Sequence, residues 1–173
     1  MDTTPLEVGE TRVSPNARLI NTASREVRVE RIAPQRTLKG SRVEIWVPRP
    51  GLRRASDLTD LPPVPRGGVG PFPPRGATLA DLRPAAGARV AGRSGSAFAR
   101  LPLLITVTPT RRGCAGFGGL VIEYRSGFRR YRRIMKFAFG GHAGQRASPA
   151  IVVGGRIWSA CNEVIHRLAD RSG

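Results

Sequence analysis

The stretch GGLVIEYRSGFRRYRRIMKFAF, residues 118–139, decides the expected fold because it has the pattern of a long β-hairpin. Apolar and charged residues alternate on both sides of Ser126-Gly127 with the two-residue period of a β-strand. Glycine takes the positive φ of a tight hairpin turn without steric cost. The sequence therefore predicts a turn at Ser126-Gly127, with Glu123 opposite Arg130.

The two faces of this hairpin are expected to differ in polarity. The apolar face carries Leu120, Ile122, Tyr124, Tyr131, Met135, Phe137 and Phe139. The wet face carries Glu123 and a candidate anion-binding group of four basic residues, Arg125, Arg130, Arg132 and Lys136. Arg133 falls on the apolar side of the alternation, which predicts a bulge or the end of a sheet at that position.

Other alternating segments place the chain in the mostly-β class. Strands are expected at 6–8, 17–20, 26–32, 42–47, 101–108 and 151–153. The turn residues 21–24 are expected to join the second and third of these into another hairpin. Strands that are polar on one face are typical of antiparallel sheets with one face in water. The predicted fold is an antiparallel, immunoglobulin-like β-sandwich.

Two segments depart from the β pattern. Residues 48–84 hold nine of the 15 prolines, and proline lacks the N–H that a central strand donates, so a long Pro/Gly-rich surface loop is expected there, pinned to the body by Phe72. Near the C-terminus the apolar spacing predicts one amphipathic helix, carried by Cys161, Val164, Ile165 and Leu168. The predicted organisation is a β-sandwich domain over 1–150, including the loop, with a C-terminal strand and helix over 151–173 packed on it.

The positive charge lies mainly in the second half of the chain. The formal net charge is +17; residues 1–81 hold 13 basic and 9 acidic side chains, and residues 82–173 hold 16 and 3. Such asymmetry indicates an anionic partner, whether nucleic acid, a membrane surface or an acidic polymer. Of the 29 basic residues 27 are arginine, and with 21 glycines this composition is also typical of a high-GC bacterium, so the charge can equally reflect codon usage.

No catalytic, cofactor or metal motif occurs in the sequence. The Gly-rich pieces at 67–70, 116–119 and 140–144 lack the lysine and Ser/Thr of a phosphate-binding loop. Cys114 and Cys161 have no C-x-x-C or H-x-x-x-H spacing around them, so they are expected to form either one disulfide or two buried thiols. We therefore expect no enzyme, no cofactor and no metal.

The basic hairpin at 119–139 leaves two functions open. A two-stranded ribbon fits a major groove, and aromatic residues among arginines are typical of nucleic-acid surfaces. The alternation, however, places Tyr131 in the core, which leaves the charge without a stacking surface. The leading interpretation is a non-catalytic interaction or structural module whose partner is a protein, an acidic polymer or a membrane surface; a nucleic-acid-binding protein is the alternative.

Targeting signals are not apparent in the sequence as given. No run approaches the roughly 18 apolar residues of a membrane span. The N-terminus MDTTPLEVGE lacks the basic and apolar regions of a signal peptide. A cytoplasmic location is expected as encoded, and an extracytoplasmic one if the true start lies upstream.

Several short motifs, taken in order, resemble a loosely defined family of uncharacterised actinobacterial envelope proteins with an immunoglobulin-like β-sandwich. The motifs cover about residues 6–139 and are LINTA at 19–23, EVRV at 26–29, GGVGPFPP at 67–74, LRPAAG at 82–87 and the hairpin at 121–131, which ends in Arg129-Arg130-Tyr131. The resemblance implies a β-sandwich with a Pro/Gly loop, closed by a final hairpin, at the cell envelope. It implies no catalytic residues.

Overall fold

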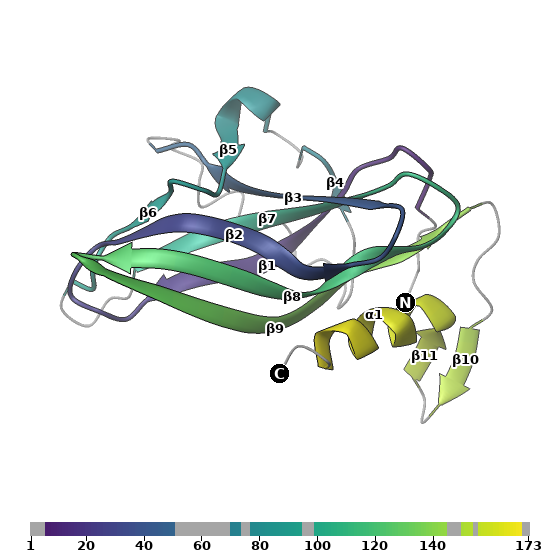
Figure 1. The fold of residues 1–173 in the computed structure, drawn as a ribbon. Helices are drawn as coiled ribbons and strands as arrows, with labels where there is room; N and C mark the ends of the chain where they lie inside the picture. The colour runs from purple at the N-terminus through teal and green to yellow at the C-terminus, as the bar shows by residue number, and fades with distance from the viewer. Residues whose placement is uncertain are drawn as a thin grey trace.

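The computed structural model of the protein shows, in the residues that it describes, two main antiparallel β-sheets with a hydrophobic core between them and one short α-helix (Figure 1). The structure describes residues 6–50, 70–73, 77–94, 99–144, 150–153 and 156–170. Most of the predicted Pro/Gly-rich loop, residues 51–69 and 74–76, lies outside the described residues. The mostly-β class with antiparallel sheets is thus confirmed.

The five-stranded sheet has the order β4-β1-β7-β3-β5. Its strands are β1 (Arg12–Asn21), β3 (Ser41–Pro48), β4 (Gly70–Pro71), β5 (Leu82–Pro84) and β7 (Ala99–Pro109), with a 3-10 helix at Leu79–Asp81 before β5. The strongly apolar β7 lies at the centre. The two strands from the proline-rich stretch, β4 and β5, lie at the edges, where a missing ladder donor is tolerated.

The four-stranded sheet has the order β6-β2-β8-β9. Its strands are β2 (Val27–Thr37), β6 (Arg89–Val90), β8 (Gly113–Ser126) and β9 (Arg129–Ala143). Near the C-terminus, β10 (Ala150–Val153) and β11 (Arg156–Ser159) pair with each other, and α1 (Ala160–Asp170) follows. The predicted strand at 151–153 therefore forms a small ribbon of its own.

The predicted hairpin between 17–20 and 26–32 is wrong, because β1 and β2 belong to different sheets. The side chain of Asn21 stabilises the turn through which the chain passes from one sheet to the other. Its Nδ2 donates to the carbonyls of Arg25 (2.8 Å), Val90 (3.2 Å) and Ala91 (2.8 Å), and its Oδ1 accepts from the N–H of Ala23 (3.0 Å). These bonds satisfy a buried amide and bring β6 alongside the turn.

The β8–β9 hairpin is present, but its turn is displaced by one residue from the prediction. Ser126 pairs with Arg129, so the loop is Gly127-Phe128, and Gly127 takes the positive φ of 57°. Glu123 consequently lies opposite Arg132 instead of Arg130. The displaced turn keeps every side chain on its predicted face, which is why alternation alone did not distinguish the two registers.

Arg133 marks neither a bulge nor the end of the sheet. The pairing is regular through Ile122 and Arg133, and the register shift in this hairpin lies between Gly118 and Leu120. Since β9 is the edge strand of the four-stranded sheet, Arg133 remains exposed although its neighbour across the ladder is buried. Both expectations for this position are therefore wrong, because the ladder continues to Ala143.

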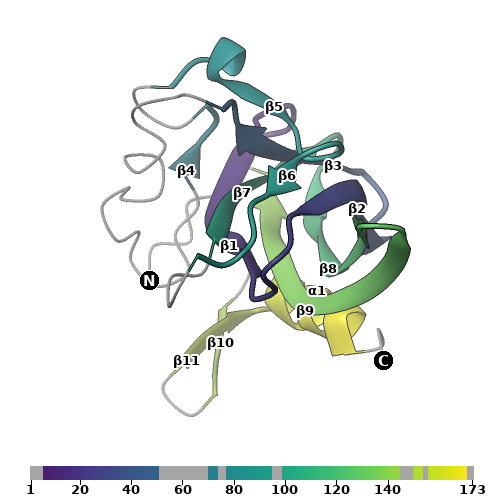
Figure 2. The same ribbon diagram turned by 90° about the vertical axis from the view of Figure 1, so that its left-hand side faces the viewer.

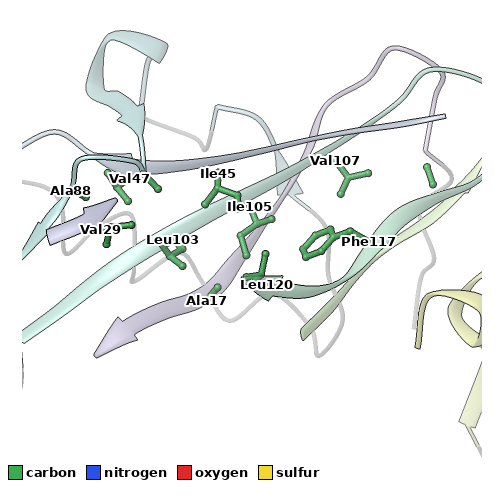
Figure 3. Packing of buried hydrophobic residues seen from close by; sticks show 12 residues of the cluster. Ala17, Val29, Ile45, Val47, Ala88, Leu103, Ile105, Val107, Phe117 and Leu120 are labelled. Carbon is green, nitrogen blue, oxygen red and sulfur yellow. The ribbon is translucent and has the colours of Figure 1, made fainter. Parts of the chain in front are cut away.

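The main core lies between the two sheets (Figure 3). Leu103, Ile105 and Val107 of β7 are fully buried there, as are Phe117 and Leu120 of β8. A smaller apolar cluster of Val13, Leu82 and Leu104 lies on the other side of the five-stranded sheet. Beside it the rings of Trp46 and Phe72 are 5.8 Å apart, so Phe72 packs on the body as expected.

The helix α1 packs on the outer face of the four-stranded sheet, the face turned away from the core. Cys161 and Ile165 of the helix are buried, while Val164 is 42% exposed, so the apolar stripe is narrower than its spacing indicated. Added Cβ atoms at Gly116 and Gly140 would lie 3.0 and 2.7 Å from Ile165 Cδ1, so these glycines let the helix approach closely. A disulfide joins Cys161 to Cys114, with the Cα atoms 5.2 Å apart.

Candidate anion-binding face

A row of four arginines crosses the outer face of the four-stranded sheet, at the end away from α1. Arg28 of β2 lies opposite Arg89 of β6 on one side and opposite Arg125 of β8 on the other, and Arg125 lies opposite Arg130 of β9. We call these four residues the arginine row; all four are exposed. With adjacent strands roughly 4.8 Å apart, the row spans about 14 Å.

Strand alternation explains why these side chains point to solvent. Val27 and Val29 flank Arg28 on β2, and Val29 is buried in the core, so Arg28 points away from it. On β8 the neighbouring Tyr124 lines a cleft between the sheets, and Arg125 takes the opposite face. Figure 2 views the molecule from this end, where the β8–β9 turn lies.

Acidic residues compensate the arginine row only in part. Glu30 lies 2.8 Å from an Nη of Arg125 and 3.4 Å from Nε of Arg130, and Glu26 lies 3.4 Å from an Nη of Arg89. In the described part of the chain no carboxylate lies within ion-pair distance of Arg28. Like charges directly opposite each other in a sheet are destabilising, so four arginines against two glutamates leave this face suited to an anion.

A second row runs beside the first and is also basic. Arg31 of β2 lies opposite Glu123 of β8, and Glu123 lies opposite Arg132 of β9. Glu123 thus faces an arginine on both sides, and the row keeps one excess positive charge. The next row, Ala33, Val121 and Ile134, is uncharged and ends the basic area.

The structure brings together three of the four predicted anion-binding residues. Arg125 and Arg130 belong to the arginine row, and Arg132 lies in the row beside it. Lys136 is exposed on the same face of β9, but exposed Ile134 separates it from the arginines. Sequence reasoning missed Arg28, Arg31 and Arg89, because their positions on this face depend on pairings between distant strands; the alternation of 26–32 already turned Arg28 outward.

The aromatic residues of the hairpin lie on its other face. Tyr131 stacks on Tyr124 with ring centroids 5.2 Å apart and planes at 15°. Tyr131 is 39% exposed, so the expectation that the core hides it is wrong. It nevertheless faces the space between the sheets and not the arginine row. Charge and stacking surface are therefore separated by the thickness of the hairpin.

Two kinds of feature are absent from the described residues, 6–50, 70–73, 77–94, 99–144, 150–153 and 156–170. No helix there is long and apolar enough to cross a membrane. No group of three or more His, Cys, Asp or Glu side chains there is placed to hold a metal ion. Cys114 and Cys161 are bonded to each other, which decides between the two alternatives left open for them in favour of the disulfide.

Comparison of the chain with known protein families, with curated proteins and with solved structures found no match.

Proposed function

We propose that this protein is a non-catalytic interaction module that binds an anionic polymer or surface at the cell envelope through the arginine row. The observation that carries the proposal is the pairing of Arg28 with Arg125. Both residues lie on interior strands of the four-stranded sheet, and both are exposed. An immunoglobulin-like sandwich is the fold class to which we assign the two sheets.

Protection of a sheet edge is the competing explanation for the charge. Charged side chains on an edge strand prevent pairing with other chains, and this accounts for Arg130 and Arg132 on β9. It does not account for Arg28 and Arg125, because β2 and β8 have neighbours on both sides. Repulsion between these two arginines is unfavourable unless an anion compensates it.

The disulfide supports a location in the envelope. Disulfides persist in oxidising compartments and are rare in a reducing cytosol. Cys114 and Cys161 join β8 to α1, and Cys161 is buried, so the bond holds two parts of the fold together. The resemblance to actinobacterial envelope proteins points to the same setting.

Nucleic-acid binding is the second candidate function. The arginine row favours it, because arginines at strand spacing can contact successive phosphates. The position of Tyr131 on the opposite face disfavours it, because bases that stack there would be directed away from the arginine row. We rank it second for that reason.

Salt-dependent binding separates the two functions. The purified protein is titrated with labelled polyphosphate, with vesicles that contain phosphatidylglycerol, and with labelled duplex DNA. We expect polyphosphate or vesicle binding that weakens with salt, and only weak DNA binding that disappears near physiological salt, roughly 150 mM. DNA binding in the submicromolar range at that salt concentration would reverse our ranking.

Matched double variants test the site itself. Arg28→Ser with Arg125→Ser removes the centre of the arginine row, and we expect binding to fall about tenfold at low salt. The control is Arg42→Ser with Arg100→Ser, which removes the same charge from exposed positions; Val43 and Leu101, next to them, pack on the core, so both arginines point outward from the five-stranded sheet. Equal losses in the two variants would show that net charge, and not this face, attracts the anion.

A further inference from the structure

The two sheets separate along one side of the molecule, where each ends in an open edge. On the five-stranded sheet, β4 pairs only with Arg12 and Val13 of β1, so among the described residues β1 has an open edge from Ala17 onward. On the four-stranded sheet the edge is β9. A cleft of about 380 Å³ lies there and is lined from both edges, a volume within the range of small-molecule sites.

The floor of this cleft is apolar and well buried. Val29, Val90 and Ile122 form it and are at most 5% exposed. The stacked pair Tyr124 and Tyr131 lines the cleft as well, and so does half-buried Met135. Leu19 lines it from the opposite sheet. Such a surface accepts a flat or linear apolar body.

The charged groups at this cleft are all of one sign. Arg133 of β9 lines it, and among its described lining residues there is no aspartate or glutamate. Arg133 occupies the face of β9 that looks inward, opposite buried Ile122. An exposed guanidinium beside an apolar floor can donate hydrogen bonds to the carboxylate of an amphipathic molecule whose chain lies on that floor.

We propose that this cleft binds a free amphipathic carboxylate of the fatty-acid type. Its apolar chain lies on Tyr124, Tyr131 and Met135, and its carboxylate accepts hydrogen bonds from Arg133. The volume suits one chain of moderate length and is too small for a two-chain membrane lipid. The site is independent of the arginine row, because residues of β9 point alternately into the cleft and to the outer face.

Competition between two ligands of equal chain length tests the proposal. Anilinonaphthalene sulfonate, a fluorescent apolar anion, serves as the probe bound to the whole protein. Decanoate and decanol are then compared as competitors. We expect decanoate to bind roughly tenfold more tightly than decanol, since only decanoate engages Arg133. Equal affinities, or no displacement by either ligand, would overturn the proposal.

Two variants and one control locate the site. Arg133→Ser is expected to abolish the preference for decanoate while decanol binding is kept. Tyr131→Ala is expected to weaken both ligands. The control is Arg132→Ser, which removes the same charge from the next residue on the outer face and is expected to leave both affinities unchanged. An effect of Arg132→Ser equal to that of Arg133→Ser would contradict the site, whereas decanoate binding that survives Arg133→Ser in full would contradict the role of that arginine.

Discussion

The two ends of the outer face of the four-stranded sheet are built in opposite ways. At one end, Gly116 and Gly140 lack side chains, and α1 lies directly on the backbone, fixed by the Cys114–Cys161 disulfide. At the other end the same strands carry the arginine row, which no described element covers. Figure 1 shows α1 beside one half of β8 and β9 only.

The difference shows how one pair of strands serves two purposes. Where a helix must approach closely, glycine removes the obstacle, and burial of Ile165 contributes stability. Where the surface stays in water, long charged side chains are tolerated even when they repel one another. We therefore expect substitutions at the end covered by α1 to change the stability of the fold, and substitutions at the end that carries the arginine row to change binding.

The largest expected effect is the loss of the disulfide. The bond closes a loop of sequence separation 47. Constraint of the unfolded chain by such a loop contributes roughly 4 kcal/mol to stability on the chain-entropy estimate. Cys161→Ser should lower the free energy of unfolding by about that amount, measured by urea denaturation. Wild-type protein treated with reductant should behave like the variant; no difference between oxidised and reduced protein would contradict a stabilising role of the bond.

A smaller loss is expected where α1 meets the glycines. A Cβ at position 140 would lie 2.2 Å from the carbonyl oxygen of Ala115 and 2.6 Å from Gly116 Cα, so backbone must move. Gly140→Ala should therefore cost about 1–3 kcal/mol, measured as a shift in the urea midpoint.

The neighbouring Gly141 provides the matched control for this substitution. A Cβ there meets only the end of the Leu6 side chain, at 3.2 Å, and a side-chain end can shift more easily than backbone. Gly141→Ala should be clearly milder than Gly140→Ala. Equal losses would mean that helix packing does not depend on close approach at Gly140.

The smallest effect on stability is expected at the end of the sheet that carries the arginine row. Arg28→Ser relieves repulsion from Arg89 and Arg125, so stability should stay within about 0.5 kcal/mol of wild type or rise slightly. Glu30→Gln should act in the opposite direction, because it removes the carboxylate shared by Arg125 and Arg130; for partly exposed pairs the loss is about 1 kcal/mol or less. Thermal denaturation of both variants measures the contrast. A substantial loss of stability in Arg28→Ser would mean that this arginine supports the fold.

The alternation of apolar and charged residues correctly predicted the two faces of the β8–β9 hairpin, but it did not predict how the other strands pair. The faces of β8 and β9 follow from the order of apolar and charged residues, and they are as expected. The pairing of 17–20 with 26–32 was wrong, because alternation and a turn do not say whether two strands share a sheet. Asn21 decides this by bonding to Val90 and Ala91, residues that are distant in the sequence.

The same distinction between local pattern and distant pairing applies to the residues of the candidate sites. Arg125, Arg130 and Arg132 were found because one hairpin places them on one face. Arg28 and Arg89 were missed, since they join the row only through pairings between strands far apart in the chain. The cleft was not foreseen at all, because its lining comes from both sheets and from the end of the β4 pairing.

The sequence by itself determined the β-rich class, the helix near the C-terminus and the face of the β8–β9 hairpin that carries the charges. These properties are local, because the period of a strand or helix assigns side chains to faces. Only the tertiary structure decided the strand partners, the bond between Cys114 and Cys161, the arginine row and the cleft. These depend on which distant segments pack together, and burial of the shared core selects that arrangement among many with the same alternation.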